Sequence, residues 1–398
     1  MKPLFFDAHM HAMNLTHPNF VSFVESIADN VGEFITSGAL SPGYLFTSSN
    51  RGKQGFITLS NLFTLFERSI GEIFTVMEQD LKGSYGHKKD QAYIRDGKFH
   101  FREKAYDHYG LIPLVMDFSH LDGEYEQKAY YSVSHKEKIL SYVRDTIEGI
   151  AYYQKQNKEG IFKFFPFLGI NPEAHSLEFI KTLIDDNLPS PFAGIKFYPP
   201  LGTNPWPEDK EELKKTRYIY DYCVERNVGI ISHCDDQGFR GVASKIAQHY
   251  TNPDTWKVVF KHYPTLKLDF AHYGRQYNPI GKNPIKLLLD HSFTEDPWFK
   301  DIMLLMGRYE NIYADFSFSG TDGDFYSELH TFLEELEDRS LAEKIKKRSM
   351  FGSDFSINLA KVESYSEYLK TFETSPFSDE EIHLFASENP MRFLNLID

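Results

Sequence analysis

The sequence AGIKFYPPLGTNPWPEDKEELKKTRYIYDYCVERNVGIISHC, residues 193–234, holds two short apolar runs separated by a long amphipathic stretch. The runs Ala193–Tyr198 and Gly229–Cys234 have the apolar and aromatic content of buried strands. The stretch Glu208–Arg226 between them has helical periodicity. A strand, a helix and a second strand in this order predict a unit in which the two strands lie parallel.

The same unit recurs along the chain, with a further helical stretch predicted over Asp324–Arg348. Eight strands that alternate with helices predict an α/β fold, a closed (β/α)8 TIM barrel forming one domain over residues 1–398. An open, doubly wound sheet is the alternative. The six other strand-like runs are Leu4–His11, Leu111–Phe118, Phe162–Ile170, Leu266–Ala271, Asn311–Phe316 and Met350–Asp354.

A long insertion interrupts this pattern between the first two strands, over residues 12–109. Part of it, Leu59–Leu81, has helical periodicity, and other parts are polar and rich in glycine. The loop after the first strand of such a barrel leaves the face where active sites lie. We therefore expect the insertion to form a lid over the catalytic face.

The composition restricts the partners and the compartment. The chain has 43 basic and 57 acidic residues and a net charge of −14, which argues against nucleic acid and anionic membrane. The two cysteines, Cys223 and Cys234, are too few for a disulfide framework. We expect the Cys234 side chain to be buried and to pack against the helices. The N-terminal apolar run is too short for a signal peptide or an anchor, so the sequence predicts a cytoplasmic protein. The sequence is also compatible with a homo-oligomer.

The first strand ends in Asp7-Ala8-His9-Met10-His11. Side chains alternate along a strand, so His9 and His11 should point the same way and be able to share one cation. Alone, such a pair is more often two polar residues at a strand end than a metal site. Here, however, three other predicted strands end in His233, His272 and Asp354. Imidazole and carboxylate ligands suit Zn²⁺ and neighbouring metals, so the sequence predicts a site for one or two divalent ions, most readily Zn²⁺.

These motifs resemble the amidohydrolase superfamily of metal-dependent hydrolases. The phrases at Gly194–Pro200, Phe270–Gly274, Phe351–Phe355 and Glu388–Pro390 are similar to its amidohydrolase-related branch, which also includes decarboxylases like aminocarboxymuconate-semialdehyde decarboxylase. The resemblance covers both ends of the chain and every strand after the third. The long insertion departs from compact members of the branch, so their substrate pockets are not carried over.

The resemblance implies roles for these residues. His9, His11 and His233 would bind the metal, with Asp354 beside it. Asp354 would take a proton from the metal-bound water as general base. His272 would either bind a second metal or polarise a substrate carbonyl.

Lys196 has three interpretations. In the superfamily, a lysine at this place can be carbamylated and bridge two metals, or it can stay unmodified in the active site. The residues alone also allow an ion pair with a carboxylate such as Asp235 or Asp236.

Other residues are weaker candidates. Arg240 and Arg275 follow the fifth and sixth strands, so either could bind a substrate carboxylate, although solvated arginines are as common there. Tyr198 could donate a hydrogen bond to substrate or pack in its loop. Asp117 and His120 at the end of the second strand fit capping or turn roles better than catalysis.

The leading functional prediction is hydrolysis of a C–N or C–O bond in a small polar substrate such as an amide, cyclic amide, lactone or ester. The alternatives are a metal-dependent decarboxylase of an unsaturated or aromatic acid, and a non-catalytic metal-binding barrel. A ligand set accompanied by a carboxylate base argues against the last, since a structural site closes its coordination shell.

Overall fold

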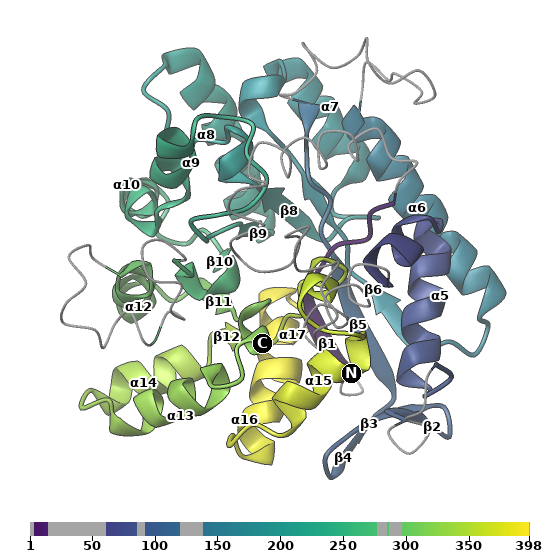
Figure 1. The fold of residues 1–398 in the computed structure, drawn as a ribbon. Helices are drawn as coiled ribbons and strands as arrows, with labels where there is room; N and C mark the ends of the chain where they lie inside the picture. The colour runs from purple at the N-terminus through teal and green to yellow at the C-terminus, as the bar shows by residue number, and fades with distance from the viewer. Residues whose placement is uncertain are drawn as a thin grey trace, which may run out of the picture.

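A ring of parallel strands surrounded by helices forms the centre of the protein (Figure 1). The computed structural model describes residues 4–14, 61–85, 92–119, 138–276, 285 and 297–397. The central strands are β1 (Leu4–Met10), β5 (His108–Pro113), β6 (Phe162–Phe164), β7 (Phe167–Gly169), β8 (Gly194–Phe197), β9 (Gly229–Ser232), β10 (Leu268–Phe270), β11 (Ile312–Asp315) and β12 (Ser349–Met350).

The strands pair in parallel in two groups, β1-β5-β6 and β12-β11-β10-β9-β8-β7. β6 and β7 are two halves of the predicted strand Phe162–Ile170. Between them lies Pro166, which lacks the amide proton that a ladder needs. They act together as one strand, because β6 pairs with β5 while β7 pairs with β8.

Hydrogen bonds beyond the regular strands join the two groups into a closed ring. On one side Leu114, just after β5, pairs with Phe167 of β7. On the other side the Ala8 amide donates to the Phe351 carbonyl at 2.9 Å, and Met10 pairs with Phe355. The predicted (β/α)8 barrel is confirmed.

Helices cover the outside of the ring. The predicted stretch Glu208–Arg226 forms α8, begun by Asp209, whose side chain accepts the amide of Glu211 at 2.9 Å. The stretch Asp324–Arg348 instead forms two helices, because Asp338 caps a new start. The helices are α5 (Ile70–Leu81), α6 (Lys138–Gln156), α7 (Leu177–Asn187), α8 (Lys210–Arg226), α9 (Ser244–Thr251), α10 (Trp256–His262), α12 (Trp298–Arg308), α13 (Phe325–Glu335), α14 (Arg339–Lys346), α15 (Tyr365–Glu373), α16 (Asp379–His383) and α17 (Asn389–Phe393).

Two apolar cores follow from the alternation of side chains along the strands. In β10, Leu268 and Phe270 belong to the large core between strands and helices, which also holds Cys234, as predicted. Ala271 belongs to a smaller core drawn from strands all around the ring, so that core fills the barrel interior. Phe393 of α17 joins this interior core. The end of the barrel interior that lies near α17 is therefore apolar.

Strand β1 departs from simple alternation. Its pairing with β5 shifts register between Asp7 and Met10. Asp7 accepts a hydrogen bond from Tyr365 of α15, outside the ring, whereas His9 contacts Asp315 of β11. Asp7 and His9 thus face different sides although they are two residues apart.

The described parts of the insertion lie against outer helices. Helix α5 packs on α6 and α15. The small antiparallel sheet of β2 (Ile94–Arg95), β3 (Lys98–Phe101) and β4 (Lys104–Tyr106) is tied to the chain after α15, because Arg102 donates to the carbonyl of Glu373 at 2.7 Å. Residues 15–60 and 86–91 lie outside the described residues, so the lid stays a prediction.

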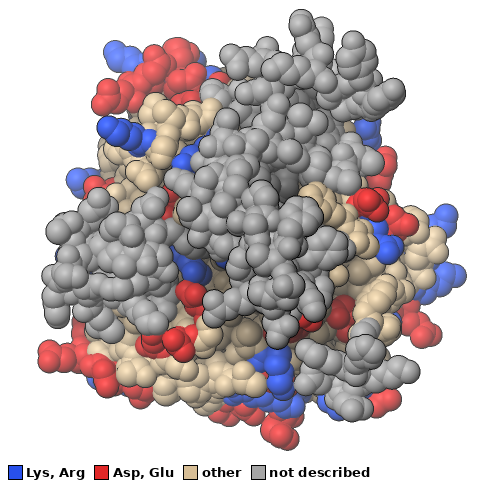
Figure 2. All heavy atoms as spheres, viewed as in Figure 1, with Lys and Arg blue, Asp and Glu red and all other residues tan. Residues whose placement is uncertain are grey.

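The surface seen in Figure 2 mixes both signs of charge. Described Lys and Arg side chains are scattered among Asp and Glu and form no continuous basic field on this face. None of the described helices is long and apolar enough to cross a membrane.

Close packing inside the barrel makes Gly110 of β5 a sensitive position. A Cβ there would lie 2.4 Å from the ring of Phe6. Gly110→Ala should therefore lower the free energy of unfolding by about 1–3 kcal/mol, the usual cost of overpacking a core. In a Phe6→Leu background the same substitution should cost less, as measured by denaturant unfolding. Gly323→Ala, where a Cβ meets nothing within 4 Å, is the control. Equal costs at the two glycines would contradict the packing argument.

Candidate metal centre

Four buried histidines meet at the carboxyl ends of the strands. His9 and His11 end β1, and their Nε2 atoms lie 3.3 Å apart. His233 follows β9 and His272 follows β10, with 3.2 Å between Nδ1 of His233 and Nε2 of His272. The rings of His9 and His272 join the two pairs at a centroid distance of 4.8 Å. Asp354 follows β12 and places Oδ1 3.4 Å from Nε2 of His11.

The outward-facing nitrogen of each ring contacts an oxygen. Nδ1 of His9 lies 2.8 Å from Oδ2 of Asp315, and Nδ1 of His11 lies 3.1 Å from the Leu114 carbonyl. A carboxylate or carbonyl oxygen only accepts, so the facing nitrogen carries the ring proton. The same reasoning applies to His233, whose Nε2 faces the Gln237 carbonyl at 3.2 Å. It applies also to His272, whose Nδ1 faces the carbonyl and hydroxyl of Ser317 at 3.3 and 2.9 Å.

The other nitrogen of each ring therefore presents a lone pair to a shared volume. Burial, with added repulsion from Lys196, lowers the pKa of His9 and of His11 well below the ordinary value. Burial and the His9 ring do the same for His272. Because these facing nitrogens carry no proton, they cannot donate hydrogen bonds to one another. A divalent cation is the partner that would accept their lone pairs. The residues present fit a metal centre.

Asp354 completes the group around His9 and His11. Three groups of this cluster have possible ligand atoms within 4.8 Å of one another: His9, His11 and Asp354; His9, His272 and Asp315; and His233, His272 and Asp235. In the last two groups the carboxylate faces the nitrogen that carries the ring proton, so of the three groups the first has its carboxylate on the lone-pair side. Burial raises the pKa of Asp354 well above its usual range, and the Lys196 ammonium opposes that shift. A cation beside the carboxylate would favour its ionised form.

The sequence analysis did not assign Asp315 or Ser317 to the centre. Asp315 accepts from the ring of His9 and from the backbone amides of His272 and Ser317, at 3.2 and 2.9 Å. Ser317 Oγ lies 3.2 Å from Nδ1 of His9. The sequence did contain a signal, because β11 ends in an aspartate just as the chain after β12 does.

Lys196 points into the barrel from β8 and is 1% exposed. Its Nζ has no hydrogen-bond partner among the described residues, and it forms no ion pair with Asp235, which instead contacts His233 at 3.1 Å. Burial lowers the pKa of Lys196 to about 8, although nearby carboxylates such as Asp315 and Asp354 oppose the shift. A lysine with this pKa is partly neutral near pH 8, as a reactive amine must be.

An aromatic wall, formed by Tyr198, Phe239 and Phe118, flanks the centre. The Tyr198 ring stacks on His233 at 4.4 Å and on Phe239 at 6.2 Å, and Phe239 contacts Phe118 at 6.3 Å. The Phe239 amide donates to Tyr198 Oη at 3.1 Å. Gly238, with a φ of +103°, lets this loop approach, since a Cβ there would lie 2.6 Å from Tyr198 Oη. All three rings follow carboxyl ends of strands, on the catalytic face.

The remaining candidates lie around this face. Arg275 is buried and pairs with Asp322 at 2.7 Å, which joins the loops after β10 and β11. Arg240 donates to the Asp236 carbonyl at 3.2 Å. Asp117 accepts from Nε2 of His175 at 2.7 Å and so ties the chain after β5 to the chain after β7. His120 lies outside the described residues.

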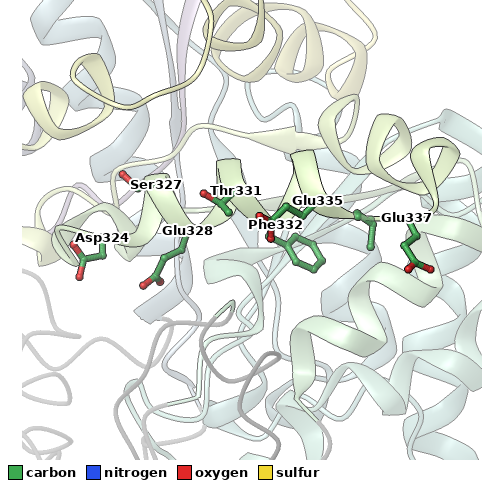
Figure 3. A pocket seen from close by; sticks show the side chains of 8 residues that line it. Asp324, Ser327, Glu328, Thr331, Phe332, Glu335 and Glu337 are labelled. Carbon is green, nitrogen blue, oxygen red and sulfur yellow. The ribbon is translucent and has the colours of Figure 1, made fainter.

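A hollow of about 750 Å³ runs along α13, away from the histidines. Figure 3 shows its side chains projecting from that helix, several of them acidic. Its lining is Asp324, Ser327, Glu328, Thr331, Phe332, Glu335, Leu336 and Glu337. These side chains offer no imidazole and share no residue with the metal centre, so we assign the hollow no part in the chemistry.

Comparisons place this geometry among known proteins. Residues 165–396, more than half of the chain, match the family model described as amidohydrolase. No curated protein matches the chain at a significant level. The structure of 5-carboxyvanillate decarboxylase from Novosphingobium aromaticivorans, complexed with manganese and 4-hydroxy-3-methoxy-5-nitrobenzoic acid, is similar with a TM-score of 0.50. It is 11% identical, over 99% of this chain and 96% of that chain.

A second solved structure is 4-oxalomesaconate hydratase from Rhodopseudomonas palustris. It is 13% identical, with a TM-score of 0.45 over 98% of this chain and 96% of that chain. At such low identity the likeness to the decarboxylase supports a shared fold alone.

The first prediction for the centre concerns the metal itself. Purified protein should carry at least one equivalent of a divalent first-row ion, and the double variant His9→Ala with His11→Ala should lose it, because two ligands disappear. Elemental analysis by mass spectrometry measures the content. His383→Ala removes a histidine that contacts Tyr106 outside the centre and should keep the metal. Full metal content in the double variant would refute the assignment.

A second prediction concerns Asp315. In Asp315→Asn the side-chain oxygen should still accept hydrogen bonds from the backbone amides of His272 and Ser317, which turns the side-chain NH2 toward His9. That donor would force the ring proton onto Nε2, the atom that faces the metal position. Metal affinity should fall about 10–100-fold, the range for lost contacts behind a ligand. Asp322→Asn, at a half-exposed carboxylate paired with Arg275, is the matched control. Equal affinities in the two variants would contradict this role.

Proposed function

The chain belongs to the amidohydrolase family and is a metal-dependent enzyme of that superfamily, and from this premise we propose that it decarboxylates a flat, unsaturated or aromatic carboxylic acid. The sequence analysis favoured hydrolysis and held decarboxylation as an alternative. The aromatic rings beside His233 support placing decarboxylation first.

The aromatic wall carries the proposal. Its rings lie nearly parallel where they meet the centre, with interplanar angles of 26° between Tyr198 and His233 and 17° between Tyr198 and Phe239. Tyr198 and Phe118 are buried, whereas Phe239 is only partly buried, so its ring is the one on which a flat, conjugated molecule can stack. A conjugated substrate also suits decarboxylation, because a proton added to the carbon that bears the carboxylate turns the π system into an acceptor for the electrons of the breaking bond.

The reaction needs a proton as well as an electron acceptor. The ring or alkene carbon that bears the carboxylate first takes a proton and becomes tetrahedral. The bond from that carbon to the carboxylate carbon then breaks, CO2 leaves, and the electron pair of the bond restores the π system. A bound divalent cation would supply positive charge that orients the substrate's oxygens. Asp354, 3.4 Å from Nε2 of His11, is the carboxyl group placed to hold that proton and release it to carbon.

Positively charged groups near the wall would recognise the acid. We propose that Arg240, next to Phe239, and the buried Lys196 bind substrate oxygens, and that Arg275 contributes from the neighbouring loop. In this proposal Lys196 acts unmodified, with its Nζ 5.9 Å from the centroid of the Tyr198 ring. A carbamylated Lys196 bridging two ions is the competing state.

Hydrolysis of a C–N or C–O bond is the second candidate. It is favoured by the same position of Asp354, which would then remove a proton from water instead of delivering one to carbon. A non-catalytic barrel fits less well, because the four neighbouring imidazoles and Asp354 are more groups than the four ligands of one structural ion.

The metal is proposed to be Zn²⁺, because imidazole nitrogens dominate the ligand set. The 5-carboxyvanillate decarboxylase structure contains manganese. Preparations of this protein loaded with each ion should therefore be compared.

The test offers the metal-loaded protein a panel of aromatic and unsaturated acids, together with amides, lactones and esters. We expect one of the acids to release CO2 with a matching change in its ultraviolet absorbance. Asp354→Asn should keep the fold and lower that turnover by about 10²-fold or more, the scale of lost proton transfer by a side chain.

Melting temperature and metal content of the same variant serve as controls. Turnover of lactones or amides without CO2 would replace the proposal by hydrolysis. Normal decarboxylation by Asp354→Asn with its metal intact would leave the reaction standing but remove Asp354 from it.

A further inference from the structure

Asp7 is a fully buried carboxylate to which the proposed reaction assigns no role. Its Oδ1 accepts from the backbone amides of Ser353 at 2.8 Å and of His9 at 3.2 Å. Its Oδ2 accepts from the hydroxyls of Ser353 and of Tyr365, the latter at 2.9 Å. One side chain thus connects strand β1, the turn after β12 and helix α15.

The turn that it contacts has an unusual backbone. Asp354 has a φ of 59°, in the left-handed region that residues with a Cβ disfavour. Its amide donates to the His9 carbonyl at 2.8 Å, and its carbonyl accepts from Asn358 at 3.0 Å. The Ser353 hydroxyl, besides donating to Asp7, accepts from the Phe355 amide at 2.9 Å. Such a conformation persists only where neighbouring groups hold it.

We propose that Asp7 is a positioning residue for Asp354. By binding Ser353 through both its amide and its hydroxyl, it holds the turn against β1 in the conformation that directs the Asp354 carboxylate at His9 and His11. Asp7 faces away from the imidazoles, so it can act on the centre through this turn and through the backbone amide of His9. The inference rests on the metal centre that the proposed function uses, and not on the choice between decarboxylation and hydrolysis.

The test measures Co²⁺ affinity of the metal-stripped, full-length protein by competition with a chromophoric chelator. Asp7→Ala removes all four hydrogen bonds and should weaken affinity about 10–100-fold, as expected for lost support of a metal ligand. Asp7→Asn should restore most of it, because its carbonyl oxygen can still accept from the amides of Ser353 and His9. Unchanged affinity in Asp7→Ala would overturn the proposal.

A second comparison separates positioning from general damage. In an Asp354→Asn background, Asp7→Ala should lower Co²⁺ affinity by a clearly smaller factor, because the group that it positions has already lost its charge and only the contact with the His9 amide remains to be lost. Equal fold losses in the two backgrounds would show that Asp7 acts independently of Asp354, and would also overturn the proposal. Since neither measurement uses a substrate, failure of the decarboxylation assay leaves both outcomes readable.

A matched control comes from Glu78, another buried carboxylate that receives a tyrosine hydroxyl, that of Tyr153 at 2.8 Å, between α5 and α6. Glu78→Ala should lower the melting temperature and leave Co²⁺ affinity unchanged. If Asp7→Ala does not fold, Ser353→Ala replaces it, since it removes one donor to Asp7 and should give a smaller loss that disappears in the Asp354→Asn background. A Ser353→Ala loss that persists there would refute the link.

Discussion

Four imidazoles direct unprotonated nitrogens toward one another in the buried interior. The lone pairs of these nitrogens repel one another, and the structure around them has to offset that repulsion. Each ring is held from behind by an oxygen, contributed by Asp315, Leu114, Gln237 and Ser317 in turn. These oxygens come from the chain at or after β5, β9 and β11, so the orientation of the rings depends on the closed barrel. Without a cation the lone pairs repel one another, and with one they become ligands. The centre therefore links the fold to metal binding through electrostatics and not through one covalent or apolar contact.

Much of this could be predicted from sequence because it depends on local patterns. Apolar runs ending in histidine or aspartate predicted the strands, and they predicted five residues that the structure brings together, since the strand ends of a barrel converge. The boundary of the second strand was less accurate. The sequence predicted Leu111–Phe118, whereas β5 is His108–Pro113, because Tyr109 and Gly110 pair with β1 and extend it backward.

The supporting residues were harder to predict because their roles depend on distant partners. Asp7 looks like a member of the His9 and His11 face until the register shift in β1 turns it toward α15. Asp315 is a strand-end aspartate whose importance appears only when β11 lies beside β10 and across from β1. The aromatic wall depends on loop conformation at Gly238, which periodicity does not encode.

The seam between β1 and β12 has a consequence for biosynthesis. The hydrogen bonds that close the barrel there, from Ala8 to Phe351 and from Asp354 to His9, join segments more than three hundred residues apart, and the same segments carry three of the proposed metal ligands, His9, His11 and Asp354. During synthesis, His9 and His11 are made with the first strand, whereas Asp354, which lies beside them in the folded protein, is made after the last strand. Closure of such a distant pair is slow relative to local helix formation. We therefore expect the proposed metal site to be complete only after the last strand has joined β1, and a nascent chain that lacks this strand leaves one edge of β1 unpaired.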